Sequence, residues 1–182
     1  MSMISVTLPD GSINEYTTGI TAGEIVIDIE GRKHDCVAAM VDGEQKDFSA
    51  TLDSDCSVTG ISAFDDDGMY ILRHSAAHLL AQAITSLYPD AKPTIGPPVD
   101  RGFYYDFADL NDFGEADLKA VQKKMHELAR RNLTLERIEC SDTELEELFA
   151  SNPYKLEIIK DKLEEGAGTS IYQQGDWYDL CL

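Results

Sequence analysis

Two histidines separated by three residues are the first side chains in this sequence that could do chemistry. His74 and His78 lie in residues 69–88, which are predicted to form a helix that stops at Pro89, because proline cannot continue the helical hydrogen-bond ladder. Positions i and i+4 share one face of a helix, so both imidazoles should point the same way. Such a pair can bind one metal ion or share one hydrogen-bond network with a substrate.

The residues around the histidines favour a binding role. Helical periodicity places an apolar stripe, which we expect to face the core, away from the histidines, and it consists of Leu72, Ala76, Leu79, Leu80, Ala83 and Leu87. The small neighbours Ala77 and Ala81 leave room for a ligand to approach the rings. A zinc protease is not indicated, because the HExxH motif needs a glutamate where this chain has Ser75.

A short aromatic run follows a loop that is rich in turn-forming residues. Residues 103–107 read Phe-Tyr-Tyr-Asp-Phe and are predicted to form a strand, in which alternate side chains point to opposite faces. Phe103, Tyr105 and Phe107 should therefore face the core, and Tyr104 and Asp106 the other side. These two either pack at a sheet margin or line a binding pocket.

The first 64 residues are predicted to form one compact unit. Strands at residues 5–8 and 12–16 flank Pro9-Asp10-Gly11, which is a hairpin signal. Thr21 and Glu24 form a capping box that should start a helix over residues 22–30. Further strands are expected at 36–41, near 48 and at 57–62. The charge run at residues 65–68 lacks apolar side chains and marks the predicted domain boundary.

The rest of the chain alternates helices and strands. We expect helices at residues 115–131, from Ser141 to about 151 and from Pro153 to about 163. Strands are expected at 133–140, up to 172 and at 177–181, with a loop at 166–168. His126 should lie on the solvated side of its helix. The pattern indicates an α+β fold.

Composition and charge limit the possible functions. With 34 acidic and 15 basic residues the net charge is -19, so the chain is not a general polyanion binder, because nucleic-acid affinity draws on Lys and Arg. The acidity fits enhanced solubility or a salty cytoplasm. No apolar run approaches the roughly 18 residues of a membrane span, and the start lacks the features of a secretory signal. The four cysteines have no CxxC spacing, so we expect a cytoplasmic protein with reduced thiols.

Four motifs carry a resemblance to a known family. In order along the chain they are RHSAAHLLAQAI, TIGPPVDRGFYYDF, NPYKLEI and YQQGDWYDLC. Together they resemble the N-terminal part of threonyl-tRNA synthetases, and VTLPDGS and VDGE in the first unit resemble the TGS domain. The resemblance implies a β-grasp TGS domain over residues 1–64. It implies an α+β editing domain, with helices packed on a mostly antiparallel sheet, over residues 65–182.

The resemblance also implies a site and a reaction. The editing domain of this family hydrolyses seryl-tRNA(Thr) made in error, at a site between the HxxxH helix and a CxxxH motif. Matched residue by residue, the resemblance implies catalytic roles for His74, His78, Lys155, Asp179 and Cys181. Tyr104 and Asp106 become substrate-binding candidates, and no metal ligand is assigned. Which group acts as the general base stays open, because a neutral histidine can either accept a proton or donate a hydrogen bond.

The end of the chain departs from the family pattern. Leu182 stands where the family has arginine, and the motif's final histidine would lie three residues beyond it. We therefore expect a truncated chain that folds but edits poorly.

The partners and cofactors implied by the resemblance belong to the full-length enzyme. They are tRNA(Thr), the remaining synthetase domains, a second subunit of a homodimer, and ATP and zinc for an aminoacylation domain that this chain lacks. No cofactor or membrane partner is expected for this chain.

Two alternative functions remain open. TGS domains also occur in GTPases and guanosine-tetraphosphate synthetases, so the chain could be a binding module without catalysis, although it has no P-loop. The other alternative is a zinc-dependent hydrolase in which His74, His78 and Cys181 hold the metal, as in the related editing domain of alanyl-tRNA synthetase. Metal analysis of the purified protein separates these alternatives.

Overall fold

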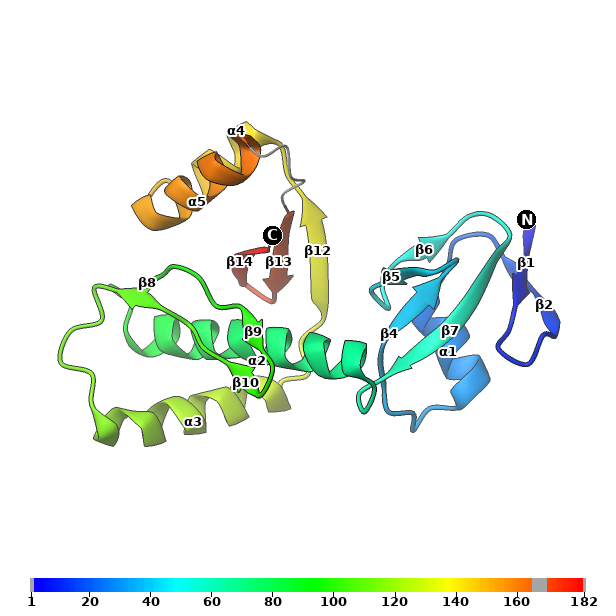
Figure 1. The fold of residues 1–182 in the computed structure, drawn as a ribbon, viewed down its shortest axis with the longest axis horizontal. Coiled ribbons are helices and arrows are strands. Elements are labelled where there is room, and N and C mark those ends of the chain that lie inside the picture. Colours follow the sequence, from blue (N-terminus) through cyan, green and yellow to red (C-terminus); the bar gives the residue numbers. More distant parts are fainter. Residues whose placement is uncertain (1, 165–169, 182) are drawn as a thin grey trace. The chain divides into compact units, whose positions relative to one another are not determined.

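The structure is a computed structural model that describes residues 2–164 and 170–181. The chain divides into two compact units, residues 1–72 and 73–182, which are coloured by sequence in Figure 1. This division falls inside a helix, whereas the charge run placed the boundary between residues 64 and 65. The boundary at residue 64 stays a prediction, and the loop expected at residues 166–168 lies outside the described residues.

The first unit is a sheet that packs against one helix. Five strands lie in the order β2-β1-β7-β4-β5, and a further pair joins β3 to β6. β1 runs parallel to β7, and the other neighbours are antiparallel. The elements are β1 Met3–Thr7, β2 Ile13–Thr17, β3 Ile20–Thr21, α1 Ala22–Glu30, β4 Cys36–Val41, β5 Glu44–Lys46, β6 Thr51–Leu52 and β7 Cys56–Ser62.

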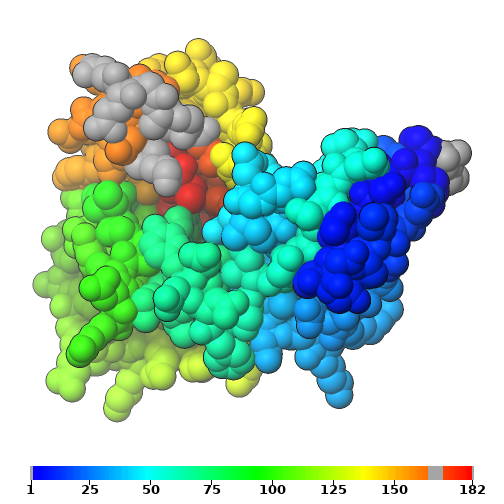
Figure 2. Space-filling view, turned by 45° about the vertical axis from the view of Figure 1, so that its right-hand side comes forward, coloured from blue at the N-terminus to red at the C-terminus, as the bar shows by residue number. Residues whose placement is uncertain are grey.

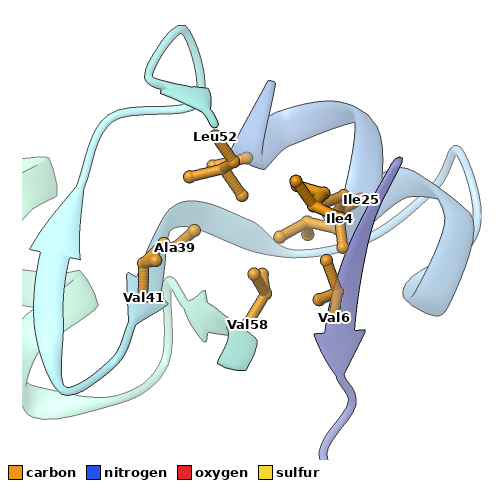
Figure 3. Packing of buried hydrophobic residues seen from close by; sticks show 9 residues of the cluster. Ile4, Val6, Ile25, Ala39, Val41, Leu52 and Val58 are labelled. Atoms are coloured by element: carbon orange, nitrogen blue, oxygen red, sulfur yellow. The ribbon is translucent and has the colours of Figure 1, made fainter. Parts of the chain in front are cut away.

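Local sequence signals explain these elements. Gly11 has φ +82° in the turn between β1 and β2, a conformation that favours glycine. At the start of α1 the Thr21 hydroxyl accepts from the Glu24 backbone N–H at 3.2 Å, and the Glu24 carboxylate accepts from the Thr21 backbone N–H at 2.9 Å. The predicted bounds of α1 and β4 are confirmed. Figure 3 shows the resulting core, where Ile25 of α1 packs near Ile4 and Leu52.

Within its described residues, the second unit combines four helices with a three-stranded antiparallel sheet of order β12-β13-β14, which confirms the predicted α+β class. None of the helices in the described part of the chain is long and apolar enough to cross a bilayer. The elements are α2 Asp66–Leu87, β8 Lys92–Pro93, β9 Pro98–Val99, β10 Gly102–Phe103, β11 Phe107–Ala108, α3 Glu115–Arg130, β12 Leu135–Glu139, α4 Asp142–Leu148, α5 Pro153–Glu164, β13 Ser170–Gln174 and β14 Trp177–Cys181.

The predicted core stripe of α2 is wrong in part. Leu72 and Leu87 are exposed, whereas Ala77, Ala81 and Gln82 on the side of the histidines are buried. The cause is the β13–β14 hairpin, which packs on this side. Its Trp177 donates an indole N–H to the Thr85 hydroxyl at 3.1 Å, and Gln82 Nε2 donates to the Gln174 carbonyl at 3.3 Å. Small alanine side chains let the hairpin approach the helix closely.

The predicted strand at residues 103–107 is also wrong in part. The structure forms two short strands, β10 and β11, and residues 104–106 connect them. The backbone of Asp106 pairs with the opposite loop, since its N–H donates to Ile95 and its carbonyl accepts from Thr94, both at 2.9 Å. The loop before the aromatic run at residues 103–107 is rich in turn-forming residues, so only a short segment of it can pair with the run as a strand.

Replacing Gly23 by alanine tests the packing of α1. Alanine has a helix propensity about 1 kcal/mol better than glycine, but a Cβ at residue 23 would lie 2.8 Å from Phe48 Cβ and 3.0 Å from the Phe48 carbonyl oxygen. Overpacking costs about 1 to 3 kcal/mol, so Gly23→Ala should lower the free energy of unfolding measured in urea. Gly102→Ala is the control, because a Cβ there meets no atom within 4 Å. Stabilisation by Gly23→Ala would contradict this packing.

Candidate active site

The α2 helix brings the two histidines into direct contact. His74 and His78 lie one turn apart, and their Nε2 atoms are 3.0 Å from each other. One of these nitrogens must carry the proton that the other accepts, since a neutral imidazole has one donor and one acceptor. His78 is buried, and its ring also lies against those of Tyr172 and Trp177 from the β13–β14 hairpin. His74 is only half-buried and is the more accessible of the pair.

The last described strand supplies the other side of the site. Asp179 and Cys181 are two residues apart in β14, so their side chains leave the sheet on the same face. Cys181 Sγ lies 3.7 Å from His74 Nε2, and Asp179 Oδ2 lies 3.5 Å from His78 Nδ1. Figure 2 shows part of the surface of this C-terminal segment in red, next to green residues of the second unit.

Asp179 is the most enclosed charged group of the site, with 1% of its surface exposed. Its Oδ1 accepts from Lys155 Nζ at 2.7 Å and from the Leu180 backbone N–H at 2.8 Å. Its Oδ2 accepts a short hydrogen bond from the Tyr105 hydroxyl. Two side chains and one backbone group therefore compensate the carboxylate for its loss of water.

Lys155 is positioned from the first turn of α5. Before it, Asn152 accepts from the Lys155 backbone N–H at 3.3 Å and donates its side-chain N–H to the Pro93 carbonyl at 2.8 Å, which links α5 to β8. Lys155 is 3% exposed, and its Nζ also donates to the Tyr105 hydroxyl at 3.1 Å. The Lys155 ammonium, the Asp179 carboxylate and the Tyr105 phenol thus form a closed triangle.

Burial sets the protonation of the site. It lowers the pKa of His78 to about 4 and also lowers the pKa of His74, although the nearby Asp179 carboxylate opposes both shifts. Both imidazoles are therefore neutral at pH 7. Burial raises the pKa of the Tyr105 phenol, and the negative charge of Asp179 raises it further. The phenol therefore stays protonated. Nδ1 of His78 has no hydrogen-bond partner among the described residues, because Asp179 contacts it without forming a hydrogen bond.

The structure brings together all five residues predicted to be catalytic, His74, His78, Lys155, Asp179 and Cys181. It does not bring Tyr104 or Asp106 into this cluster. Tyr104 is 47% exposed, and Asp106 is also exposed. The tyrosine of the cluster is Tyr105, whose hydroxyl donates to Asp179 and accepts from Lys155. Its ring stacks on that of Phe107, with the ring centroids 5.0 Å apart.

Sequence reasoning missed Tyr105 as a functional residue and assigned it to the core. The sequence did contain a signal for it. A tyrosine that faces the core needs a hydrogen-bond partner for its buried hydroxyl, so a polar group was to be expected beside Tyr105. Leu182, the other departure noted above, lies outside the described residues.

Three of these side chains could hold a metal ion. The ligand atoms of His74, His78 and Cys181 all lie within 4.8 Å of one another. Two imidazoles and one thiolate leave a fourth tetrahedral position open, which suits a catalytic zinc with a bound water. The donor set therefore fits zinc in chemistry and spacing.

Comparison with known proteins shows which proteins the chain is similar to. Residues 4–60 match the TGS domain. Over 96% of its length the chain is 41% identical to the threonine–tRNA ligase of Thermoplasma acidophilum, and over 98% it is 43% identical to that of Rubrobacter xylanophilus. The ligase of Natronomonas pharaonis is 41% identical over the whole chain. The chain spans only 25% to 28% of the length of these ligases. It is homologous, over nearly its full length, to the N-terminal region of the threonyl-tRNA synthetase family, with a TGS domain as its first unit.

Proposed function

We propose that the second unit is a proofreading site that hydrolyses the seryl ester of mischarged tRNA(Thr). The observation that carries this proposal is the convergence of two neutral histidines, a thiol and a buried Lys155–Asp179 pair on one site. In the reaction, water adds to the ester carbonyl and the bond to the ribose oxygen breaks. The products are serine and tRNA with a free 3′-terminal hydroxyl.

The accessibility of the side chains supports a division of roles. His74 is half-buried and neutral, so it can accept a proton from the attacking water and return it to the ribose oxygen. His78 contacts His74 and fixes its orientation. Cys181 is also partly accessible and lies beside His74. Asp179 has no accessible oxygen to offer a substrate, so it acts as a positioning residue for Lys155 and Tyr105.

A positive charge near the ester would stabilise the negative charge that develops on its carbonyl oxygen. Lys155 supplies this charge from within the protein, where a field acts more strongly than in water. The Lys155 side chain is 3% exposed, and its ammonium contacts both the Asp179 carboxylate and the Tyr105 hydroxyl. These contacts hold the ammonium in one place. The charge is thus in position before the substrate binds, and little reorganisation is needed during the reaction.

The need for such a site follows from the size of serine. Serine lacks one methyl group of threonine, and a difference of this size supplies only about 1 to 3 kcal/mol of discrimination in a binding pocket. A second, hydrolytic site that excludes the larger threonine can remove the error. In the full-length protein we place this site beside an ATP- and zinc-dependent aminoacylation domain, in a cytoplasmic homodimer.

Replacing His74 by alanine tests the proposed chemistry. Loss of a general base typically costs a factor of about 100 to 10,000, so deacylation of seryl-tRNA(Thr) should fall at least 100-fold. His126→Ala is the matched control, since His126 is exposed on α3, and it should deacylate at the parent rate. The rates are measured in the chain and in the longer protein that continues through the family's final motif histidine. A His74→Ala rate equal to that of His126→Ala would refute the proposal.

Removing the Asp179 charge separates structure from catalysis. Asp179→Asn leaves the Lys155 ammonium buried without its counter-ion, so the free energy of unfolding should fall by about 3 to 5 kcal/mol. The double variant Asp179→Asn/Lys155→Met should recover most of this loss, because neither charge remains. Deacylation should stay low in the double variant, since the positive charge is absent. Full activity of the folded double variant would exclude a role for the Lys155 charge.

The cluster of ligand atoms favours zinc-dependent hydrolysis as a second candidate function. A bound zinc would supply a water with a pKa lowered to about 7. Metal analysis of the purified protein distinguishes the two candidates, and the proposal above predicts deacylation that persists after treatment with a chelator. Stoichiometric zinc that is lost in Cys181→Ala, together with inactivation by the chelator, would favour the second candidate.

A further inference from the structure

Asn152 is a buried polar residue directly before α5, the helix that carries Lys155. It is 8% exposed. Its Oδ1 atom accepts from the Lys155 backbone N–H at 3.3 Å, and its Nδ2 atom donates to the Pro93 carbonyl at 2.8 Å. Its main chain is held as well, because its N–H donates to the Phe149 carbonyl at 2.8 Å and its carbonyl accepts from the Leu156 N–H at 3.2 Å. Asn152 is therefore fixed in place and bonded to the residue that carries the buried ammonium.

The contact of Asn152 Oδ1 caps the helix. Pro153 is the first residue of α5, where its missing N–H leaves no helical bond unmade, and Lys155 is the third. Ser and Asp cap helices about as well as Asn. A carboxylate has no donor, however, and a serine hydroxyl has one oxygen for both tasks, whereas the amide has an acceptor and a donor on separate atoms. The second hydrogen bond, to Pro93, therefore needs an amide at this position.

The Pro93 carbonyl belongs to the part of the fold that carries Tyr105. Pro93 lies in β8 and is the partner of Phe107 in the antiparallel pairing of β8 with β11. The Tyr105 ring stacks on that of Phe107, with the ring centroids 5.0 Å apart. The two hydrogen bonds of the amide thus join the backbone of Lys155 to the segment that carries Tyr105. We call this pair of hydrogen bonds the Asn152 bridge.

Apolar packing does not replace this bridge. Ile159 of α5 is buried in a cluster with residues of α4, β13 and β14, whereas Ala91, next to β8, is buried in a second cluster with residues of α2 and α3. A cavity of about 460 Å³ lies beside the hydrogen bond from Asn152 to Pro93 and is lined by residues on both sides of it. Close packing fixes the spacing of two elements only where their side chains fill the space between them. At this place the spacing of α5 and β8 therefore depends on the Asn152 bridge.

The position of the Lys155 ammonium depends on both ends of a flexible side chain. Its Nζ contacts Asp179 and Tyr105 at one end, and the backbone of α5 anchors the four-carbon stem at the other. Electrostatic stabilisation of a transition state requires a charge that is in place beforehand. A displacement of about 1 Å can cost about 100-fold in rate. A group that fixes the backbone of residue 155 therefore bears on the reaction without meeting the substrate.

We propose that Asn152 is a positioning residue for the hydrolysis of the seryl ester. The Asn152 bridge holds the start of α5 at a fixed distance from β8, so that the Lys155 ammonium and the Tyr105 hydroxyl meet at Asp179 before a substrate binds. Asn152 acts through Lys155 and does not itself contact the substrate. The inference rests on the proposed function and adds to it a residue outside the five that were predicted to be catalytic.

Three variants separate the bridge from the helix cap. Asn152→Ser keeps a cap but loses the donor to Pro93, and Asn152→Ala loses both. Ser141→Ala is the matched control, because Ser141 caps α4 in the same unit. Asn152→Ala and Ser141→Ala should each lower the midpoint of thermal unfolding by about 2 to 4 °C. Asn152→Ser should unfold at a higher temperature than Asn152→Ala, since it retains the cap.

Deacylation of seryl-tRNA(Thr) is measured in the longer protein that continues through the family's final motif histidine. Asn152→Ser and Asn152→Ala should lower kcat about 10-fold or more and leave KM unchanged, because the ammonium is displaced while no substrate contact is removed. Ser141→Ala should keep the parent kcat. The parent kcat in Asn152→Ser, an equal fall of kcat in Ser141→Ala, or a loss confined to KM would each overturn the proposal.

The reactivity of the Lys155 amine tests its position without a substrate. The chain is treated with acetic anhydride, and acetylation of Lys155 is compared by mass spectrometry with that of Lys160, which is exposed on the same helix. In the parent chain the buried Lys155 should react about tenfold more slowly than Lys160, or slower still. Asn152→Ser should raise the ratio of Lys155 to Lys160 acetylation about threefold or more, and Ser141→Ala should leave it unchanged. An unchanged ratio in Asn152→Ser would overturn the proposal.

The two measurements keep this inference separate from the proposed function. His74-dependent deacylation, with kcat and acetylation unchanged in Asn152→Ser, would refute the role of Asn152 and leave the proofreading function intact. Acetylation that depends on Asn152, in a longer protein that does not deacylate seryl-tRNA(Thr), would show that the bridge holds Lys155. That result would refute proofreading and, with it, the role of Asn152 in hydrolysis.

Discussion

The buried carboxylate of Asp179 is the group on which the second unit's site depends. An isolated carboxylate without water is strongly destabilised, so this one requires a cation and hydrogen-bond donors that the fold must supply from elsewhere. Lys155 comes from α5 and Tyr105 from the loop between β10 and β11. These three segments are far apart in sequence. Because this one carboxylate needs a cation and hydrogen-bond donors, α5 and the loop between β10 and β11 both pack against β14 at Asp179.

Close packing on α2 gives the histidines their chemical state. Ala77 and Ala81 are fully buried and have small side chains, so the β13–β14 hairpin can approach the helix on the side of the histidines. The burial that results lowers the pKa of His78 to about 4. A larger side chain at either alanine would hold the hairpin away and admit water to the rings. The two alanines thus influence the pKa of the histidines through packing and need no contact with a substrate.

Local signals in the sequence predicted much of the fold. The Thr21 and Ser141 capping boxes formed as expected, with each of these residues as the N-cap of its helix, because a cap depends only on residues three positions apart. The five residues of the site were found through a family resemblance. Their contacts were not predictable from spacing, since His74 and Cys181 are 107 residues apart. Periodicity failed on α2 because it cannot show that a distant hairpin covers the polar side of the helix.

Salt screening limits the reach of the chain's negative charge. At physiological ionic strength charges are screened over about 8 Å, so most of the net charge of -19 acts only weakly at any one point of the surface. The Lys155–Asp179 pair is buried, and a buried pair is screened much less than an exposed one. The field at the candidate active site is therefore set by the groups that contact it and not by the acidic surface.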